Sequence, residues 1–180
     1  MKRAVFLDRD GVVNEAPVRD GKPYPPQDVA SLRIPPGTAE ALGRLKGKGY
    51  LLIVVTNQPD VPRGKITREA VEEINQHLRA ELRLDAVLTC YHDDADNCDC
   101  RKPKPGLLVQ AARQYEIDLP SSYMVGDRWR DTDAGENAGC KTILIDKGYQ
   151  EREPASAPDF RAHSLPEAVD WILKEDAENV

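Results

Sequence analysis

The sequence contains no apolar run long enough to cross a membrane. Its longest run covers residues 51–55, whereas a membrane-spanning helix needs about 20 predominantly apolar residues. The apolar stretch that follows Met1, Lys2 and Arg3 is interrupted at Asp8, so no secretory signal sequence is expected. From these two absences we expect a cytoplasmic protein. The sequence also lacks a heptad pattern and a long apolar surface stripe, which favours a monomer.

An excess of basic charge is missing as well. The 180 residues include 25 Lys and Arg against 31 Asp and Glu, which gives a net charge of -6 at pH 7. Binding to nucleic acids depends chiefly on a basic surface that neutralises phosphates, so a broad nucleic-acid interface is not expected. Small anionic molecules remain possible ligands wherever local cations meet them.

Cysteine is scarce, and three of the 4 cysteines lie in one short segment. Cys90 and His92 alternate in an extended stretch, and Cys98 and Cys100 alternate after the connection formed by residues 93–97. Because alternate residues of an extended chain point to the same side, the two pairs can close a tetrahedron. Cytoplasmic thiols stay reduced. We therefore interpret the four side chains as a closed, structural Zn²⁺ site.

Other interpretations of this segment are weaker. Buried thiols without a metal would need an apolar pocket. The segment is instead rich in aspartate, at positions Asp93, Asp94, Asp96 and Asp99. This acidity also argues against a zinc ribbon that binds nucleic acid, and an iron–sulfur cluster usually takes four thiolates. A structural zinc ion would fix Arg101 and Lys102, which follow Cys100 directly, so that two cations face an anionic ligand.

Five short apolar runs recur at intervals that leave room for helices between them. They cover residues 4–7, 51–55, 86–88, 123–125 and 142–145. The runs lack the alternation of a half-exposed strand, which indicates strands buried on both faces of a parallel sheet. Two proline-rich segments, residues 17–36 and 151–159, show no periodicity and are expected to be loops.

Helical patterns fill the intervals between these strands. Apolar residues recur at helical spacing over residues 71–82 and 107–115. Residues 38–48 precede Gly49, which is typical of a glycine cap, and a capping-box pattern at residues 164–167 begins a last helix. Strands and helices thus alternate. The pattern predicts a doubly wound, mostly parallel α/β sheet, and 180 residues suit one such domain.

Polar residues follow three of the predicted strands. Asp8 and Asp10 come after the first strand, Thr56 after the second and Asp127 after the fourth. Each residue taken alone could be only part of a turn or a helix cap. The carboxyl ends of parallel strands nevertheless meet at one rim, where ligands bind. Several carboxylates at one rim repel one another unless a cation offsets them, and oxygen ligands favour Mg²⁺.

Four motifs occur in an order that strongly resembles the haloacid dehalogenase superfamily of phosphatases. They are Asp8-Arg9-Asp10-Gly11, Thr56, Lys102-Pro103-Lys104-Pro105, and Gly126-Asp127 with Asp131. The resemblance covers residues 4–145 and implies a Rossmann-like phosphatase without a large cap domain. We therefore expect a single phosphatase domain over residues 1–180, with a zinc loop at residues 90–100.

The resemblance implies a role for each motif residue. Asp8 would attack phosphorus and become an aspartyl phosphate, and Asp10 would protonate the leaving group and then activate water. Thr56 would bind a phosphate oxygen, and Lys102 would offset the charge of the transferring group. Mg²⁺ would be held by the carboxylates of Asp8 and Asp127 and by the backbone carbonyl of Asp10.

Further residues near the motifs are candidates for contacts with the substrate. Asn57 and Arg101 are expected to help bind its phosphate. Lys104 is a rival of Lys102, although the Lys-Pro-x-Pro pattern favours Lys102. Asp131 either supports Lys102 or the waters of the metal, or is a first-turn acid of the next helix.

Arg128 and Trp129 stand at the same rim and have two interpretations each. Arg128 reaches the far end of a substrate, or it pairs with Asp131 or Glu136 on the following helix. Trp129 stacks on a substrate, or it packs within the protein, which is the safer interpretation.

The zinc ligands narrow the resemblance to a branch that contains heptose bisphosphate and histidinol-phosphate phosphatases. The residues around the motifs are similar to those of the heptose enzymes, and this resemblance implies removal of the 7-phosphate from D-glycero-D-manno-heptose 1,7-bisphosphate. The short connection at residues 93–97 and the Gly126-Asp127-Arg128 sequence resemble the histidinol-phosphate branch, and the Pro59-Asp60 pair departs from the pattern of the heptose group. These features favour histidinol phosphate or another small sugar phosphate. A non-catalytic module that binds a phosphate ligand is the alternative of another class. The presence of both Asp8 and Asp10 argues against that module.

Overall fold

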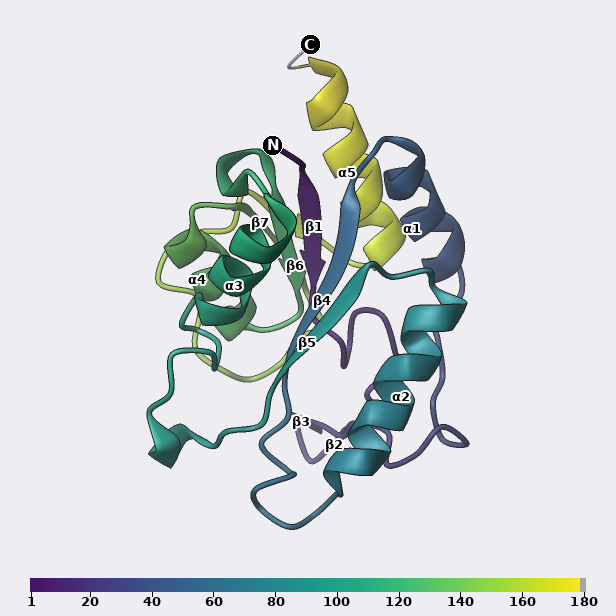
Figure 1. The fold of residues 1–180 in the computed structure, drawn as a ribbon, viewed down its shortest axis with the longest axis vertical. Coiled ribbons are helices and arrows are strands. Elements are labelled where there is room, and N and C mark those ends of the chain that lie inside the picture. Colours follow the sequence, from purple (N-terminus) through teal and green to yellow (C-terminus); the bar gives the residue numbers. More distant parts are fainter. Residues whose placement is uncertain (179–180) are drawn as a thin grey trace.

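The computed structural model describes residues 1–178 (Figure 1). Its main sheet has the strand order β5-β4-β1-β6-β7-β8, and every neighbouring pair in it is parallel. The strands are β1 (Ala4–Leu7), β4 (Leu51–Asn57), β5 (Ala86–Cys90), β6 (Tyr123–Gly126), β7 (Lys141–Ile145) and β8 (Phe160–Ala162). The helices are α1 (Thr38–Gly47), α2 (Arg68–Glu81), α3 (Gly106–Tyr115), α4 (Trp129–Ala138) and α5 (Leu165–Glu178).

Two apolar layers enclose the sheet, one on each face. Alternate residues of β1 divide between them: Val5 and Leu7 pack toward α1, α2 and α5, whereas Ala4 and Phe6 pack toward α3 and α4. Figure 1 shows these two groups of helices on opposite sides of the strands. All of β1 is buried, because both of its faces are covered. This arrangement confirms the predicted doubly wound α/β fold.

The structure adds three short strands that the sequence pattern did not predict. The proline-rich segment 17–36 contains a small antiparallel hairpin, β2 (Val18–Arg19) and β3 (Lys22–Pro23), and β8 joins the edge of the sheet beside β7. Each of these strands has two or three residues. Strands of this length are too short to produce a readable pattern, which explains the omission.

The central strands β4, β1 and β6 bring the predicted functional residues to one rim. Leu7 at the end of β1 lies level with Val54 of β4 and with Val125 of β6. The backbone N–H of Asp8 donates to the carbonyl of Val125 at 2.9 Å, which locks the first turn after β1 against β6. Between β1 and α1 the chain forms only the β2–β3 hairpin and loops, so no large cap covers this rim.

One further feature concerns the helices. Within residues 1–178, no helix is both long enough and apolar enough to span a membrane.

Candidate active site and metal centre

Lys102 is the centre of a buried charge cluster at the rim. Its ammonium group donates to Asp8 Oδ1 at 2.8 Å, to Asp131 Oδ1 at 2.7 Å and to the carbonyl of Val55 at 2.8 Å. The side chain of Lys102 is 2% exposed. Burial lowers the pKa of Lys102, but the adjacent carboxylates outweigh that effect and raise it. Lys102 therefore stays a cation beside Asp8.

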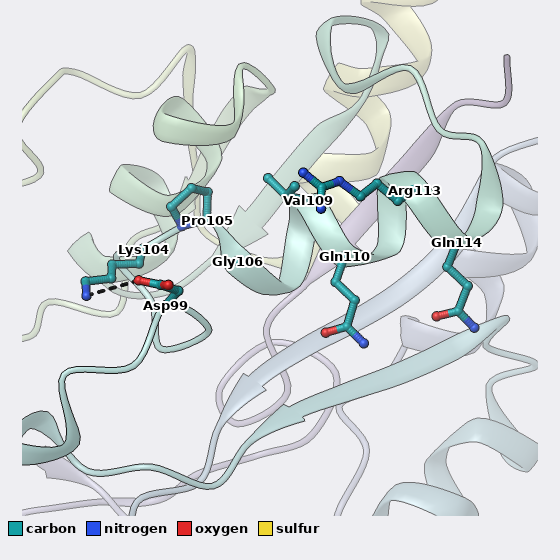
Figure 2. Close-up of a pocket in the computed structure, with 8 residues that line it drawn as sticks. All are labelled: Asp99, Lys104, Pro105, Gly106, Val109, Gln110, Arg113 and Gln114. Carbon is teal, nitrogen blue, oxygen red and sulfur yellow. Dashed lines mark ion pairs between the residues drawn. The ribbon is translucent and has the colours of Figure 1, made fainter.

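Lys104, the rival of Lys102, lies elsewhere. Its ammonium group is 3.1 Å from Asn97 Oδ1 and 3.5 Å from Asp99 Oδ1. Figure 2 shows it paired with Asp99 at the edge of an open surface pocket of about 780 Å³ along α3. Asp8 and Asp10 are not among the residues that line this pocket. The geometry thus favours Lys102, as the Lys-Pro-x-Pro pattern predicted.

Three carboxylates crowd beside Lys102. One oxygen from each of Asp8, Asp127 and Asp131 lies within 4.8 Å of the others. Burial, and then the charge of Asp131, raise the pKa of Asp8 to about 6. Burial and the charge of Asp8 likewise raise the pKa of Asp127 well above its ordinary value. Three carboxylates against one ammonium leave an excess of negative charge, which a divalent cation would offset.

Asp127 offers the free oxygen that such a cation needs. Its Oδ1 is buried and has no hydrogen-bond partner within the described residues, whereas its Oδ2 accepts from the hydroxyl of Tyr149 at 2.7 Å. Asp131 is more committed, since Oδ1 accepts from Lys102 and Oδ2 from the backbone N–H of Arg128. Asp8 and Asp127 are therefore the carboxylates that fit Mg²⁺ best, and Asp131 takes the expected supporting position beside Lys102.

Asp10 lies beside this cluster and is held by several donors. Its Oδ1 accepts from Arg9 and from the amide of Asn14, the latter at 3.0 Å. Its Oδ2 accepts from Gln58 Nε2 at 2.8 Å, and the same amide also donates to Thr56 Oγ1 at 3.0 Å. Gln58 thus links the ends of β1 and β4. The carboxylate of Asp10 is fixed near Thr56, within the rim that the sequence predicted.

Asn57 contacts the loop that carries Lys102. Its Nδ2 donates to the carbonyl of Lys102 at 3.1 Å, and its Oδ1 accepts from the backbone N–H of Lys102 at 3.1 Å. Both polar ends of the amide are thus engaged with one residue. Asn57 holds the backbone of Lys102 in place, so the structure gives it a positioning contact in addition to the predicted contact with phosphate.

The four predicted zinc ligands converge at the end of β5. Their sulfur–sulfur distances are 3.7 Å for Cys90 and Cys98, 3.2 Å for Cys90 and Cys100, and 3.5 Å for Cys98 and Cys100. His92 Nδ1 is 3.2 Å from the Cys100 sulfur. A tetrahedral Zn²⁺ with bonds of about 2.3 Å separates its sulfur ligands by about 3.8 Å. The cluster therefore fits this ion after small outward shifts.

Aspartates of the zinc loop bind the arginines around it. The loop contains the short 3₁₀ helix η1 (Asp94–Asp96). Arg63 forms two bonds of 2.6 Å with the carboxylate of Asp93, and Arg101 donates to Asp94 at 2.8 Å. Arg130 reaches the same oxygen of Asp94 at 3.4 Å. The acidic side chains of this segment thus hold three arginines, and the guanidinium of Arg101 is engaged by Asp94. The contact of Arg101 with phosphate stays a prediction.

The loop after β7 folds back over the start of α4. Arg128 donates to Glu151 at 2.7 Å rather than pairing with Asp131 or Glu136 through its side chain. Of the two interpretations of Arg128, the ion pair with Asp131 or Glu136 is therefore wrong, because the returning loop supplies the carboxylate. The contact of Arg128 with a substrate stays a prediction. The guanidinium of Arg152 stacks 3.6 Å from the ring centre of Trp129, which agrees with the packing interpretation of Trp129.

The sequence analysis assigned no role to several residues of the site. Gln58 lies two positions from Thr56 and Asn14 four positions from Asp10 in the sequence, and this closeness was a signal that could have identified them. Arg9 also lies inside a motif, but no local pattern indicates that its side chain is buried. Tyr149 belongs to a loop without periodicity, and nothing near it in the sequence points to Asp127.

Comparisons with known proteins agree with the fold. The family model described as HAD-hydrolase-like matches residues 99–170. D-glycero-beta-D-manno-heptose-1,7-bisphosphate 7-phosphatase of Helicobacter pylori is 35% identical, over 94% of this chain and 97% of that protein. The enzyme of the same name from Pasteurella multocida is 37% identical, over 82% and 84%.

Comparison with solved structures points to the same family. The D,D-heptose 1.7-bisphosphate phosphatase from B. bronchiseptica, complexed with magnesium and phosphate, has a TM-score of 0.79 and 29% identity. The match covers 96% of this chain and 99% of that one. The fold and the site thus define a hydrolase of the haloacid dehalogenase class. The chain belongs to this family, in the branch of the heptose bisphosphate phosphatases, and it is a phosphatase.

Proposed function

We propose that this protein hydrolyses a phosphate monoester through an aspartyl phosphate formed on Asp8. The buried contact between Asp8 and the ammonium of Lys102, at 2.8 Å, carries the proposal. Lys102 offsets charge on the transferring phosphoryl group while Asp8 attacks it. Thr56, which is buried at the same rim, donates its hydroxyl to a phosphate oxygen. Asn57 and Asp131 hold Lys102 from its backbone and from its ammonium group.

Two displacements at phosphorus make up the reaction. In the first, an Asp8 oxygen forms a bond to phosphorus while the bond to the alcohol oxygen breaks, and Asp10 gives that oxygen its proton. In the second, Asp10 takes a proton from water, the water oxygen bonds to phosphorus and the Asp8–phosphorus bond breaks. Inorganic phosphate leaves, and Asp8 and Asp10 return to their initial states.

Two metals complete the proposal. Mg²⁺ would be held by Asp8, by Asp127 and by the backbone carbonyl of Asp10, and when bound it neutralises phosphate oxygens and the crowded carboxylates. Zn²⁺ would be held by Cys90, His92, Cys98 and Cys100 in a structural site. The zinc loop thus fixes the start of the segment that carries Arg101 and Lys102. A single domain, a monomeric state and a cytoplasmic location stay predictions.

Gly11 provides a test of the magnesium site. It has φ +90, and a Cβ placed on it would lie 2.0 Å from Asp127 Oδ2. Gly11→Ala is therefore expected to displace Asp127 and to weaken Mg²⁺ binding by about 10- to 100-fold, as measured by calorimetric titration. Gly64 also has positive φ but open space around it, so Gly64→Ala is the matched control. Equal affinities in the two variants would contradict this placement of the metal.

The substrate that we propose is D-glycero-D-manno-heptose 1,7-bisphosphate, which loses its 7-phosphate. The names of the similar proteins, over nearly the whole chain, support this choice. The connection between His92 and Cys98 consists of residues 93–97 only. Because this connection is short, histidinol phosphate or another small sugar phosphate is the second candidate. The anomer is open.

A panel of substrates separates these candidates. Phosphate release with Mg²⁺ would be measured for both heptose 1,7-bisphosphate anomers, histidinol phosphate, fructose 1,6-bisphosphate and p-nitrophenyl phosphate. We expect one heptose anomer to exceed the other compounds by about tenfold or more in kcat/KM, because polar groups of a fitted site discriminate strongly. A higher value for histidinol phosphate would reject the heptose assignment. No turnover of any compound would favour the non-catalytic module that binds a phosphate ligand.

A further inference from the structure

Arg9 is a fully buried cation, and it lies between Asp8 and Asp10 in the sequence. Its exposed fraction is 0%, although it lies in the turn that follows β1 and leads into the active site. A buried guanidinium is costly unless its charge and its N–H groups are matched. The contacts of Arg9 therefore have to match both its charge and its N–H groups.

The guanidinium of Arg9 holds the carboxylate of Asp10. Its Nη2 lies 3.0 Å from Asp10 Oδ1 and 3.2 Å from Oδ2, and its Nε lies 3.2 Å from Oδ1. Its remaining nitrogen, Nη1, donates to Asn75 Oδ1 at 3.0 Å. Within residues 1–178, the side-chain hydrogen bonds of Arg9 go to these two residues. No carboxylate other than that of Asp10 forms an ion pair with it there.

The core fixes Arg9 from behind. Asn75 belongs to α2 and is buried, and its Nδ2 donates to Thr89 Oγ1 of β5 at 3.1 Å. The backbone of Arg9 is also held, because its carbonyl accepts from the N–H groups of Val12 and Val13 at 3.2 and 3.0 Å. A chain of contacts thus runs from β5 and α2 through Arg9 to Asp10. Neither end of Arg9 can shift without breaking a buried hydrogen bond.

The donors around Asp10 leave its two oxygens unequal. Oδ1 accepts from Nε and Nη2 of Arg9 and from Asn14, whereas Oδ2 accepts from Gln58 at 2.8 Å and from Arg9 Nη2 at 3.2 Å. A carboxylate has about four acceptor positions. Oδ1 thus takes three donor contacts and Oδ2 takes two, and the Gln58 amide that reaches Oδ2 also donates to Thr56 Oγ1. Oδ2 is therefore the less engaged oxygen and the one on the side of Thr56. By holding both oxygens, Arg9 fixes the orientation of the Asp10 carboxylate, with Oδ2 on the side of Thr56.

We propose that Arg9 is a positioning residue that holds Asp10 with Oδ2 toward the reacting groups, and thereby sets the rate of both proton transfers. The inference rests on the proposed function, because it gives Asp10 the role of acid and base. Arg9 itself touches neither substrate nor phosphorus. Its effect must pass through Asp10.

The test is a double-mutant cycle with two leaving groups. Arg9→Lys keeps the charge but loses the planar fork. It is expected to lower kcat/KM by about 10- to 100-fold for the best sugar phosphate of the panel. The loss should be under about threefold for p-nitrophenyl phosphate, whose leaving group needs no proton. In the Asp10→Asn background, Arg9→Lys should cause no further loss, because residues that act as a unit are not additive.

Additive losses, or equal losses with both leaving groups, would overturn the inference and reduce Arg9 to a structural ion pair. If Arg9→Lys fails to fold, Asn75→Ala removes the anchor of Arg9 and leaves both charges in place, and the same selective loss is expected. A wild-type protein without turnover would reject the proposed function itself. Normal wild-type turnover with an unselective Arg9 or Asn75 variant would reject only the role of Arg9.

Discussion

Asp8→Asn is expected to lower kcat by at least about 10⁴-fold, because an amide cannot form the acyl phosphate on which both displacements depend. The side chain keeps its shape and can still accept from Lys102 through its carbonyl oxygen. Burial and neighbouring carboxylates already disfavour the charge of Asp8, so the variant should fold without loss of stability. Intact-mass analysis of protein quenched during turnover should detect the mass of one phosphoryl group on the wild type and none on the variant.

Asp85→Asn is the matched control for this experiment. Asp85 accepts from the backbone N–H of Leu52 at 2.8 Å and pairs with Lys46. It therefore lies at the starts of β4 and β5, at the edge of the sheet away from Asp8. Its replacement is expected to cost about 1 kcal/mol of stability with little change in kcat. Residual activity of Asp8→Asn above about 1% of the wild type, or a phosphoryl group on another residue, would contradict the nucleophilic role of Asp8.

Much of the fold could be predicted because the strands are buried on both faces. Runs such as residues 4–7 and 51–55 are uniformly apolar, and the structure confirms them as the strands β1 and β4 at the centre of the sheet. Once these strands are parallel, their polar ends must share one rim. The positions of Asp8, Thr56 and Asp127 therefore follow from local sequence and from elementary topology.

The partners of the side chains could not be predicted in the same way. Arg9 and Asn75 are 66 positions apart in the sequence, and Tyr149 and Asp127 are 22 apart. Such contacts depend on how α2 and the loop after β7 pack, and no periodicity encodes that packing. The pairing of Arg128 with Glu151 was not among the interpretations of Arg128 for the same reason. Local spacing indicates which residues share a helix face, but it does not indicate which distant loop packs against that face.

The zinc site could be predicted only in part. The alternation of Cys90 with His92 and of Cys98 with Cys100 predicted a cluster, and the four ligand atoms lie within 4.8 Å of one another. What the sequence could not provide is the attachment of the loop to the rim. Asn57 holds the backbone of Lys102 on one side, and the zinc ligand Cys100 precedes it by two residues on the other. Loss of zinc should therefore disturb the position of Lys102.

Cys100→Ala is expected to lose the bound zinc and to lower stability on the order of 3 kcal/mol, since a structural metal site contributes directly to folding. This loss corresponds to a decrease in Tm of roughly 6 to 12 °C for a chain of this size. We also expect kcat/KM to fall by about 10- to 100-fold, because Lys102 would no longer be held from both sides. Metal analysis by mass spectrometry, calorimetry and phosphate release measure the three effects.

Cys140→Ala separates the loss of a metal from the loss of a buried thiol. Cys140 is buried and lies outside the zinc cluster, so its replacement removes a core sulfur and should cost only about 1 kcal/mol, with zinc content and kcat/KM unchanged. If Cys100→Ala retained zinc, or if the wild type contained none, the metal assignment would be wrong. If zinc were lost while kcat/KM stayed constant, the loop would be stabilised by the metal without positioning Lys102, and Asn57 with Asp131 would be sufficient to hold that lysine.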